Sequence, residues 1–373
     1  MAIFIGLMSG TSMDAIDAAL VELEGNKTRL INYLEVPFPS DLQQALATFR
    51  TVNARVSLNT FSQLHVRLGK LFAEAALQVL KQAAIRRDEV TAIGSHGQTI
   101  YHQPHPPFPC SVQIGDPNTI AQATGITTVA DFRGMDIAAG GQGAPLTPAF
   151  HQAHFHNPSI DRVVLNIGGI ANITVLPADA IKPVLGFDVG PGNALLDDWA
   201  RLHLGTPMDE DGRWSKKGRP HQDVLRNMLR DPFFHASAPK STGREYFNLD
   251  WLSSVLGQTD SHLSPEDIQA TLVSLTCRAI RIATTKYASS AGELLVCGGG
   301  AHNPVLMQEL AASLPEVKIA ATSESGLPPS SVEAVAFAWL AMQRITGKPG
   351  NLPSVTGAER AVVLGAVYQP AVR

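Results

Sequence analysis

The chain has 373 residues, of which 45% are hydrophobic and 17% charged, and its formal net charge at pH 7 is −4. A single hydrophobic core stops growing at about 300 residues, so this length predicts two domains. The charge is nearly balanced and no Lys/Arg block stands out, which argues against a nucleic-acid partner. The longest apolar helical run, 334–342, is too short for a bilayer, which takes about 20 residues.

The cysteines and the first residues indicate a reducing compartment. Cys110, Cys277 and Cys297 are odd in number and lie far apart, which is not the pattern of a disulfide framework. The opening MAIFIGLM has no basic residue ahead of its apolar ones, so it lacks the pattern of a secretory signal. We therefore expect a cytoplasmic protein that acts on small molecules.

Apolar runs with strand character alternate with helical patterns along the chain. The expected strands are 3–8, 18–23, 90–93, 127–130, 162–167, 173–176 and 294–297, and the expected helices are 61–84, 193–204, 267–288, 303–314 and 331–346. This alternation is typical of an α/β protein. The Pro-rich stretch 102–110 and the polar stretch 205–220 are expected to be surface loops.

Two segments have the same pattern of apolar run, turn of small residues and second apolar run. IFIGLMSGTSMDAIDAALVEL begins at residue 3 and RVVLNIGGIANITVLP begins at residue 162. Each is typical of a β-hairpin with a tight turn. Because the two lie about one domain apart, we expect a duplicated α/β architecture, with domains at 1–150 and 151–373.

The small residues of these two turns suit a phosphate chain. Phosphate binding needs backbone N–H groups that no large side chain blocks, and hydroxyls add further donors. The first turn offers Ser9, Gly10, Thr11 and Ser12, and the second offers Gly168 and Gly169. Ordinary hairpin turns are also rich in Gly and Ser, so a purely structural role stays open for each.

A third glycine cluster follows the expected strand 294–297. Gly298, Gly299 and Gly300 would let a flat group such as adenine lie close to the backbone, and Asn303 is a good cap for the helix that follows. The G-x-G-x-x-G fingerprint of a dinucleotide site lacks its last glycine here, which weakens that reading. The segment PKSTGRE, 239–245, has no preceding glycine of a Walker A loop.

Asp188 is the strongest candidate for a general base. It follows an apolar run and precedes Gly190, Pro191, Gly192 and Asn193, so we expect it at the end of a strand beside a helix amino terminus. The helix dipole would favour the ionised carboxylate that a base needs. A plain turn or cap role is the alternative. Asp197 and Asp198 are expected to face solvent.

Weaker candidates lie in two further Gly-containing segments. SHGQT, 95–99, and ADFRGMDIAAGGQGAPL, 130–146, each follow an expected strand, and Arg133 and Glu333 could clamp a polar substrate. Glu333 in a first helical turn is also explained by dipole compensation. His151, His154 and His156 have no fourth ligand at metal-site spacing, so we expect no metal there.

Taken together, these segments resemble the anhydro-N-acetylmuramic acid kinases, members of the actin-like, sugar-kinase and Hsp70 superfamily. The resemblance covers nearly the whole chain. It is carried by GLMSGTSMDAID, AIGSHGQT, VQIGDP, VADFRGMDIAAGGQGAPLTPAFH, LNIGGIANIT, GFDVGPGNALLDDW, PKSTGREYFN, QATL, VCGGGAHNP and LPSVTGA. Several of these motifs are long and specific to that family.

The resemblance implies two actin-like (RNase H-like) lobes, each a mixed β-sheet flanked by helices, with the nucleotide and substrate cleft between them. It implies ATP-dependent conversion of 1,6-anhydro-N-acetylmuramic acid to N-acetylmuramic acid 6-phosphate, a step of peptidoglycan recycling, with Mg²⁺. Asp188 would be the base. The ATP contacts would be Gly10, Thr11, Ser12, Met13, Asp14, Ala15, Ile16, Asp17, Gly168, Gly169, Asn172, Gly298, Gly299, Gly300 and Asn303. The sugar contacts would be Ser9, Ser95, His96, Gln98, Arg133 and Glu333, and residues 240–244 would lie beside the cleft.

Two departures from the family pattern concern the first loop. The family has Asp-Gly where this chain has Asp14-Ala15, and if that position needs φ > 0 the alanine costs roughly 1 kcal/mol. The superfamily loop carries Asp where Met8 stands here, so Mg²⁺ would be held mainly by phosphates and water.

A homodimer is compatible with the sequence.

Three rival functions stay open at this level. A kinase of an ordinary hexose hydroxyl would use Asp188 to deprotonate the alcohol directly. A nucleotide-gated module of the Hsp70 kind would hydrolyse ATP slowly and ignore amino sugars. A dehydrogenase built on residues 298–300 would bind NAD, which the incomplete fingerprint argues against.

Overall fold

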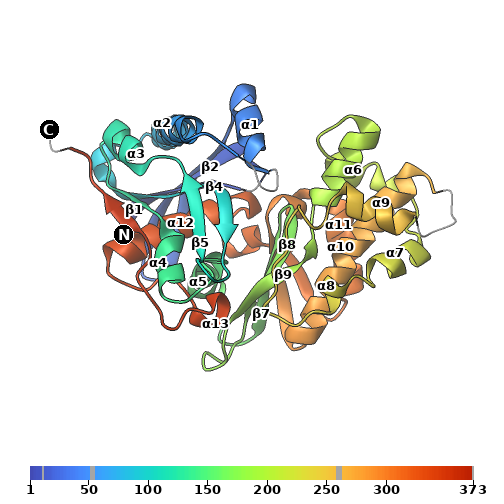
Figure 1. The fold of residues 1–373 in the computed structure, drawn as a ribbon. Helices are drawn as coiled ribbons and strands as arrows, with labels where there is room; N and C mark the ends of the chain where they lie inside the picture. The colour runs from blue at the N-terminus through green and yellow to red at the C-terminus, as the bar shows by residue number, and fades with distance from the viewer. Residues whose placement is uncertain (11, 51–54, 258–262, 372–373) are drawn as a thin grey trace. The chain divides into compact units, whose positions relative to one another are not determined.

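The computed structural model describes residues 1–10, 12–50, 55–257 and 263–371, which divide into two compact units (Figure 1). Unit 1 combines Met1–His154 with Ser331–Arg373, and unit 2 is Phe155–Ser330. The sequence assigned all of 151–373 to one domain, whereas its last segment belongs to unit 1. The apolar pattern of 331–346 predicts a buried helix, but it does not say which sheet buries it.

Unit 1 is built on a mixed sheet with the order β12-β6-β4-β1-β2-β3, and β5 pairs with β4 beside that path. Its strands are β1 (Ala2–Ser9), β2 (Ala15–Glu24), β3 (Lys27–Pro37), β4 (Val90–Gln103), β5 (Cys110–Ile114), β6 (Thr128–Ala130) and β12 (Ala366–Tyr368). β1 and β2 are antiparallel, which confirms the first hairpin, and β4 runs parallel to β1.

Two long helices cover opposite faces of this sheet. Ile5 and Leu7 of β1 lie in one core cluster with the buried side of α2 (Leu58–Ala83). Between them, Gly6 faces α12 (Val332–Ile345): a Cβ on Gly6 would lie 1.7 Å from the carbonyl oxygen of Ala334. Alternate residues of a strand point to opposite faces, so glycine at this position lets α12 approach the sheet.

The remaining helices of unit 1 are shorter. Ser57 caps α2 by accepting from the Thr60 amide, and Asp116 caps α3 from the position before Pro117, as expected for helix starts. These shorter helices are α1 (Ser40–Ala47), α3 (Pro117–Thr124), α4 (Phe132–Ala138), α5 (Thr147–Phe155) and α13 (Pro353–Thr356).

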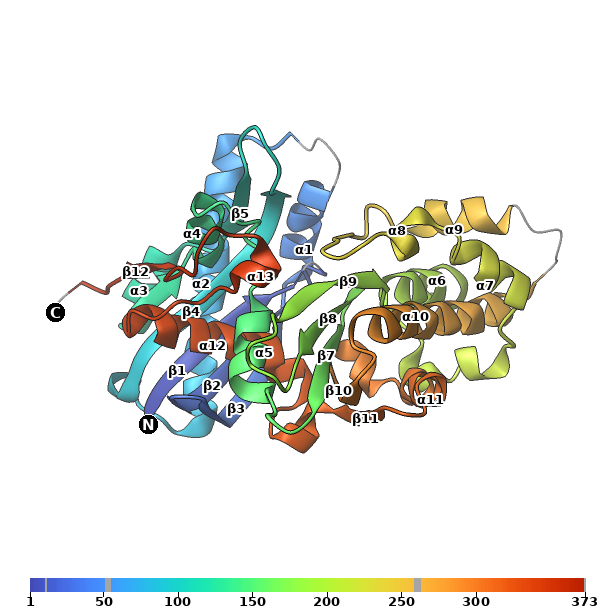
Figure 2. The ribbon, with the colours of Figure 1, turned by 90° about the horizontal axis from the view of Figure 1, so that it is seen from below.

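Unit 2 has a second mixed sheet, with the order β11-β10-β7-β8-β9. Its strands are β7 (Asp161–Ile167), β8 (Ile170–Leu176), β9 (Leu185–Pro191), β10 (Ala291–Cys297) and β11 (Lys318–Ala321). Figure 2 shows α10 running alongside this sheet, with α6 and α7 nearby. The helices are α6 (Ala194–Leu204), α7 (Gln222–Met228), α8 (Pro232–His235), α9 (Leu249–Leu256), α10 (Pro265–Tyr287) and α11 (Pro304–Ser313). β7 and β8 are antiparallel, which confirms the second hairpin.

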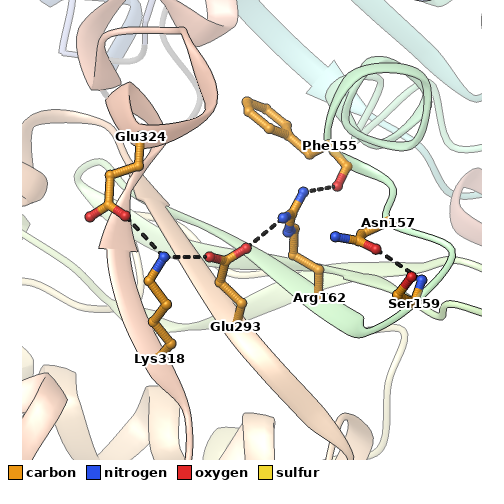
Figure 3. A network of polar contacts seen from close by, with 7 residues as sticks. All are labelled: Phe155, Asn157, Ser159, Arg162, Glu293, Lys318 and Glu324. Atoms are coloured by element: carbon orange, nitrogen blue, oxygen red, sulfur yellow. Dashed lines mark hydrogen bonds and ion pairs between the residues drawn. The ribbon is translucent and has the colours of Figure 1, made fainter.

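A network of charged side chains fixes the start of unit 2 to its sheet (Figure 3). Arg162 of β7 donates to the carbonyl of Phe155 at 2.5 Å and pairs with Glu293 of β10 at 2.6 Å. Lys318 of β11 lies 3.0 Å from both Glu293 and Glu324. Because the Glu293 side chain is only 9% exposed, its two cationic partners offset the cost of burying its charge.

The expected strands and helices all overlap observed ones, but one expected loop is more ordered than its composition suggested. Residues 205–220 contain short 3₁₀ helices at Glu210–Gly212 and Ser215–Lys217. Asp209 and Trp214 are buried there, and the Asp209 carboxylate accepts from the amides of Trp214 and Ser215 at 2.8 Å each. Within the described residues, no helix has both the length and the apolar character needed to cross a membrane.

Candidate functional site

The first turn joins β1 to β2 and is held by a buried amide. Gln98 of β4 has no exposed surface; its Nε2 donates to the carbonyls of Gly10 and Thr99 at 3.1 Å each. Its Oε1 lies 2.8 Å from the hydroxyl of Ser9, which also lies 2.8 Å from the carbonyl of Ala15. The predicted sugar contacts Ser9 and Gln98 are therefore brought together, and they brace both ends of the turn.

The left-handed residue of this turn is Met13, with φ of 54°. Its amide donates to the Gly10 carbonyl at 3.2 Å, and the Ser12 hydroxyl donates to the Asp14 carboxylate at 2.6 Å. A non-glycine residue in this region costs roughly 1 kcal/mol. The strain considered for Ala15 does not arise there, because Ala15 already pairs with Pro37 in the sheet. Thr11 lies outside the described residues.

Asp17, the last residue of the predicted first ATP loop, follows Ile16 on β2 and sits among acidic groups. Burial raises its pKa to about 7; the Tyr33 hydroxyl, which donates to the carboxylate, lowers that pKa, and the charges of Glu35 and Glu333 raise it. Asp17 is thus a weaker acid than an ordinary aspartate. Sequence analysis missed Tyr33, because a tyrosine on a strand carries no signal of such a contact.

His96 and Arg133, two predicted sugar contacts, are hydrogen-bonded to each other. Arg133 donates to His96 Nε2 from Nη2 at 2.9 Å and from Nε at 3.2 Å. His96 Nδ1 lies 2.9 Å from the Gly97 carbonyl, so Nδ1 carries the proton and Nε2 accepts. Burial, with the Arg133 charge, holds the pKa of His96 well below its usual range. His96 is therefore a neutral positioning group for the guanidinium.

Glu333 and Ser95 complete the predicted sugar contacts. The pKa of Glu333 is raised above its ordinary value, because burial outweighs the opposing effect of the nearby Arg133 charge. The same environment lowers the pKa of Arg133 to about 10, with burial the largest cause and Glu333 opposing it. The Ser95 hydroxyl is buried and has no hydrogen-bond partner within the described ranges. Arg133 and Ser95 thus both bring hydrogen-bond donors to this region.

Asp136, which sequence analysis did not single out, organises the Gly-rich loop after α4. It is fully buried, and its carboxylate accepts from the Gly143 amide at 2.7 Å, Asn351 Nδ2 at 2.6 Å and Thr356 Oγ1 at 2.8 Å. The carbonyl of Gly143 in turn accepts from Arg133 Nη1 at 2.7 Å. Asp136 therefore positions Arg133 through this loop.

The second turn, Gly168-Gly169, is held by backbone groups rather than side chains. The Gly168 carbonyl accepts from the Asn193 amide at 2.8 Å, and the Gly169 carbonyl accepts from Gly192 at 2.9 Å and Ala194 at 3.0 Å. A Cβ on Gly192 would lie 2.4 Å from the Gly168 oxygen. Close approach of the two segments thus requires glycine at 192, and it fixes the turn to the start of α6.

Asp188 lies inside β9, which continues to Pro191, and not at the strand end that the sequence predicted. It pairs in register with Asn172 of β8, which pairs with Asn166 of β7, so three polar residues form a row on one face of the sheet. The Asp188 amide donates to the Lys240 carbonyl at 3.0 Å, and its Oδ2 accepts from the Thr242 amide at 3.0 Å.

The pKa of Asp188 also differs from the expectation that a helix dipole would favour the charged form. Burial raises it to about 6; the Thr242 hydrogen bond lowers it, the Glu245 charge raises it and Lys240 lowers it. A carboxyl with a pKa near the working pH is better suited to proton transfer than a strongly acidic one. The role of Asp188 as a general base stays a prediction, and a raised pKa is compatible with it.

A cavity of about 420 Å³ lies beside the segment that bonds to Asp188. Thr242 belongs to both, because its amide donates to Asp188 and its side chain lines the cavity. The lining residues are Pro232, Phe233, Ala236, Ser241, Thr242, Glu245 and Tyr246. Sequence analysis placed only residues 240–244 near the site, since the aromatic residues of α8 lie outside any recognisable motif.

The third glycine cluster follows β10 and packs tightly on β7. Gly298 has φ of 79°, and a Cβ there would lie 2.3 Å from the side-chain oxygen of Asn166. A Cβ on Gly300 would lie 2.4 Å from Ile167, and Gly299 opens the short 3₁₀ helix Gly299–His302. Asn303 accepts from the amides of Val305 and Leu306, which confirms its predicted capping role. Packing alone accounts for Gly298 and Gly300, so adenosine contact stays a prediction.

The family model and the relatives that match this chain carry the same family name. The family model described as "Anhydro-N-acetylmuramic acid kinase" matches residues 2–370. A protein of that name from Coxiella burnetii is 48% identical over 365 residues, which is 98% of this chain and 97% of the relative. Namesakes from Photobacterium profundum and Shewanella pealeana are 48% and 49% identical, with 98% of each chain covered. The chain therefore belongs to the anhydro-N-acetylmuramic acid kinase family.

Proposed function

We propose that this protein opens 1,6-anhydro-N-acetylmuramic acid with water and phosphorylates its O6 with ATP, which yields N-acetylmuramic acid 6-phosphate and ADP in peptidoglycan recycling. Family membership over nearly the whole chain makes the protein a phosphotransferase of this class. The observation that best supports the chemistry is Asp188, a carboxyl whose pKa burial raises to about 6 and whose Oδ2 is fixed by the Thr242 amide.

Asp188 is the base of the first half of the reaction. Its carboxylate takes a proton from water, and the resulting hydroxide attacks the anomeric carbon from the face opposite the anhydro bridge. The bond between that carbon and O6 breaks, and O6 leaves with the electron pair. The Thr242 amide keeps the carboxylate in place during this step, which is what a positioned base needs.

The departing O6 is the nucleophile of the second half. It attacks the γ-phosphorus of ATP in line, and the bond to the β-phosphate oxygen breaks. The leaving group of ring opening is thus captured by phosphoryl transfer, so no separate general acid is needed. In this proposal the turns at Ser9–Ser12 and Gly168-Gly169 donate backbone N–H groups to the phosphates.

In this proposal the sugar is bound by the side chains of unit 1 that lie around Arg133. Arg133 and Ser95 supply donors, Glu333 accepts, and His96 keeps the guanidinium oriented through its Nε2. Ser9 and Gln98 shape the loop between the sugar and the phosphates. Burial of these polar groups strengthens each hydrogen bond that they make to substrate.

Mg²⁺ would neutralise triphosphate charge in this reaction. Hard oxygen ligands suit it, and the first turn supplies Asp14, while Asp17 lies on the strand that follows. Asp17 already accepts from Tyr33, and the described residues contain no group of three or more His, Cys, Asp or Glu side chains that could hold a metal. We propose that the ion is carried mainly by phosphates and water, and that Asp14, whose carboxylate accepts from the Ser12 hydroxyl, is a candidate ligand.

Product analysis tests the proposal directly. The purified chain is incubated with ATP, Mg²⁺ and the anhydro sugar, and mass spectrometry should find N-acetylmuramic acid 6-phosphate and ADP. Phosphorylation of ordinary hexoses in place of the anhydro sugar would favour the rival sugar kinase. ATP hydrolysis that no amino sugar affects would favour a nucleotide-gated module.

We also propose a cytoplasmic location and a homodimeric assembly for this protein. A cytoplasmic location suits an enzyme that needs ATP, and cell fractionation tests it. A homodimer is tested by sedimentation equilibrium, which gives the mass of the assembly.

A further inference from the structure

Arg244 has an unmatched guanidinium in unit 2. Its Nε is buried and has no hydrogen-bond partner in the part of the chain that the structure describes. Its Nη1 lies 3.8 Å from the Asp198 carboxylate, longer than a hydrogen bond, and the side chain as a whole is 33% exposed. Asp198 has a closer partner in Arg201, at 2.7 Å. The charge of Arg244 is thus incompletely matched by protein groups.

Lys240, the other cation of the same segment, already contacts protein groups. Its Nζ donates to the Phe233 carbonyl at 2.7 Å and lies 4.3 Å from the centre of the Phe233 ring. These contacts give Lys240 a structural role in packing its segment on α8. Within the described residues, Arg244 has only the 3.8 Å contact to Asp198. It is therefore the cation of this segment that is available to bind a ligand.

The position of Arg244 points to the kind of ligand. A Cβ on Gly169 would lie 3.0 Å from Arg244 Nε and 3.1 Å from Nη2, so the edge that carries these two nitrogens faces the second turn. That edge is the fork with which arginine binds two oxygens of one phosphate or carboxylate. Glycine at 169 leaves space for the guanidinium beside the turn.

We propose that Arg244 binds an oxyanion of the reaction through Nε and Nη2, and this inference rests on the proposed function. Two sources share this chemistry: a phosphate of ATP, and the carboxylate of the lactyl group on the sugar. Both are anions with paired oxygens at the spacing of the guanidinium fork. Loss of the cation should therefore weaken binding of one substrate, or slow transfer of the phosphoryl group.

The test compares Arg244→Gln and Arg244→Lys with Arg201→Gln. Arg201 pairs with the same Asp198, and the atoms nearest to a Cβ on Gly169 belong to Arg244 and not to Arg201, so its variant controls for loss of that ion pair. Calorimetry measures binding of the non-hydrolysable analogue AMPPNP and, separately, of the anhydro sugar; steady-state assays give kcat and KM. Thermal unfolding confirms that each variant is folded.

We expect Arg244→Gln to lose about 10- to 100-fold in kcat/KM, because a charge-assisted hydrogen bond is lost. Weaker AMPPNP binding identifies a ground-state phosphate, weaker sugar binding identifies the carboxylate, and a loss confined to kcat identifies the transferring phosphoryl group. Arg244→Lys should recover part of the loss because it keeps the charge without the fork.

The inference is overturned if a folded Arg244→Gln variant matches Arg201→Gln in both affinities and in kcat/KM. Gly169→Ala gives a second route, since its methyl group would displace the guanidinium edge, and it should reproduce the defect of Arg244→Gln. Failure of the wild-type chain to phosphorylate the anhydro sugar would instead contradict the proposed function, so the two failures are distinguishable.

Discussion

The two glycine turns have similar sequence patterns but are held in different ways. Side chains hold the first turn: Gln98 contacts Ser9 and Gly10 at its start, and the Ser9 hydroxyl lies 2.8 Å from the Ala15 carbonyl at its end. Backbone groups hold the second, whose carbonyls accept from the amides of residues 192–194. The strand that follows each hairpin turn or pairs with it also carries a half-buried carboxyl, Asp17 on β2 and Asp188 on β9. The comparison teaches that similar turn sequences can be fixed to their units by different kinds of contact.

The largest expected effect concerns Asp188, the carboxyl of unit 2. Asp188→Asn should lower kcat by about 10²–10⁴-fold, because the general base is lost while the Thr242 amide keeps an acceptor. AMPPNP affinity should stay the same, as measured by calorimetry. The control Asp223→Asn changes a side chain of α7 that is 64% exposed, and it should keep the wild-type rate. Near-normal turnover of Asp188→Asn would mean that another group is the base.

Alanine at one glycine of each turn region tests how the turns are held. Gly192→Ala should destabilise the protein by about 3 kcal/mol, because its Cβ would lie 2.4 Å from the Gly168 oxygen. Gly10→Ala should change stability by less than about 0.5 kcal/mol, since its nearest described neighbour is the Ser12 hydroxyl at 3.7 Å. Urea denaturation gives both free energies of unfolding. Equal losses would contradict the contrast between the turns.

The pH dependence of stability distinguishes Asp17 from Asp188. The ordinary pKa of Asp is 3.8, and burial raises that of Asp17 to about 7 and that of Asp188 to about 6. An acid whose pKa is raised by folding destabilises the folded state as pH rises between the two values. Each Asp→Asn variant should therefore gain stability relative to wild type above pH 3.8, by about 3 kcal/mol for Asp188 and about 4 kcal/mol for Asp17 when the gain is complete.

The two gains should end at different pH values. The advantage of Asp188→Asn should be complete near pH 6, and that of Asp17→Asn should keep growing to about pH 7. Both should vanish toward pH 3.8, where the unfolded acid is also protonated. Denaturation series from about pH 4 to about pH 8 measure these curves, and a gain that increases toward acid pH would reverse the sign of the account.

The smallest expected effect concerns Ala15. Since Ala15 pairs with Pro37 in the sheet, Ala15→Gly should relieve no strain and should destabilise the protein by about 0.5–1 kcal/mol. Urea denaturation measures the change. A clear gain in stability would show that position 15 does need the freedom of glycine.

Features that depend on short-range sequence patterns could be predicted from the sequence. Features that depend on contacts between distant segments could not. Both hairpins and the Asn303 cap follow from short-range patterns, so they were predictable. The return of α12 to unit 1 was not, because an apolar helix fits either sheet. Asp188 appeared to end a strand because glycine and proline follow it, yet register with Asn172 continues the pairing through Pro191.

In the candidate site, too, local features could be predicted and long-range contacts could not. Glycine turns and single acids are visible in the sequence, but their partners come from distant segments. Gln98 reaches Ser9 across the sheet, Tyr33 reaches Asp17 from the next strand, and Asp136 joins Asn351 and Thr356. The acidity of Asp188 depends on burial and on Thr242, which no local pattern reports.

Solvent oxygen is the most direct test of the central claim that water opens the anhydro ring while O6 captures the phosphoryl group. The wild-type protein is incubated with ATP and the anhydro sugar in oxygen-18 water, and mass spectrometry locates the label. We predict N-acetylmuramic acid 6-phosphate with one solvent oxygen at C1, formed about 10²–10⁴-fold more slowly by Asp188→Asn. A phosphorylated sugar that carries no solvent oxygen fixed during turnover would contradict the account.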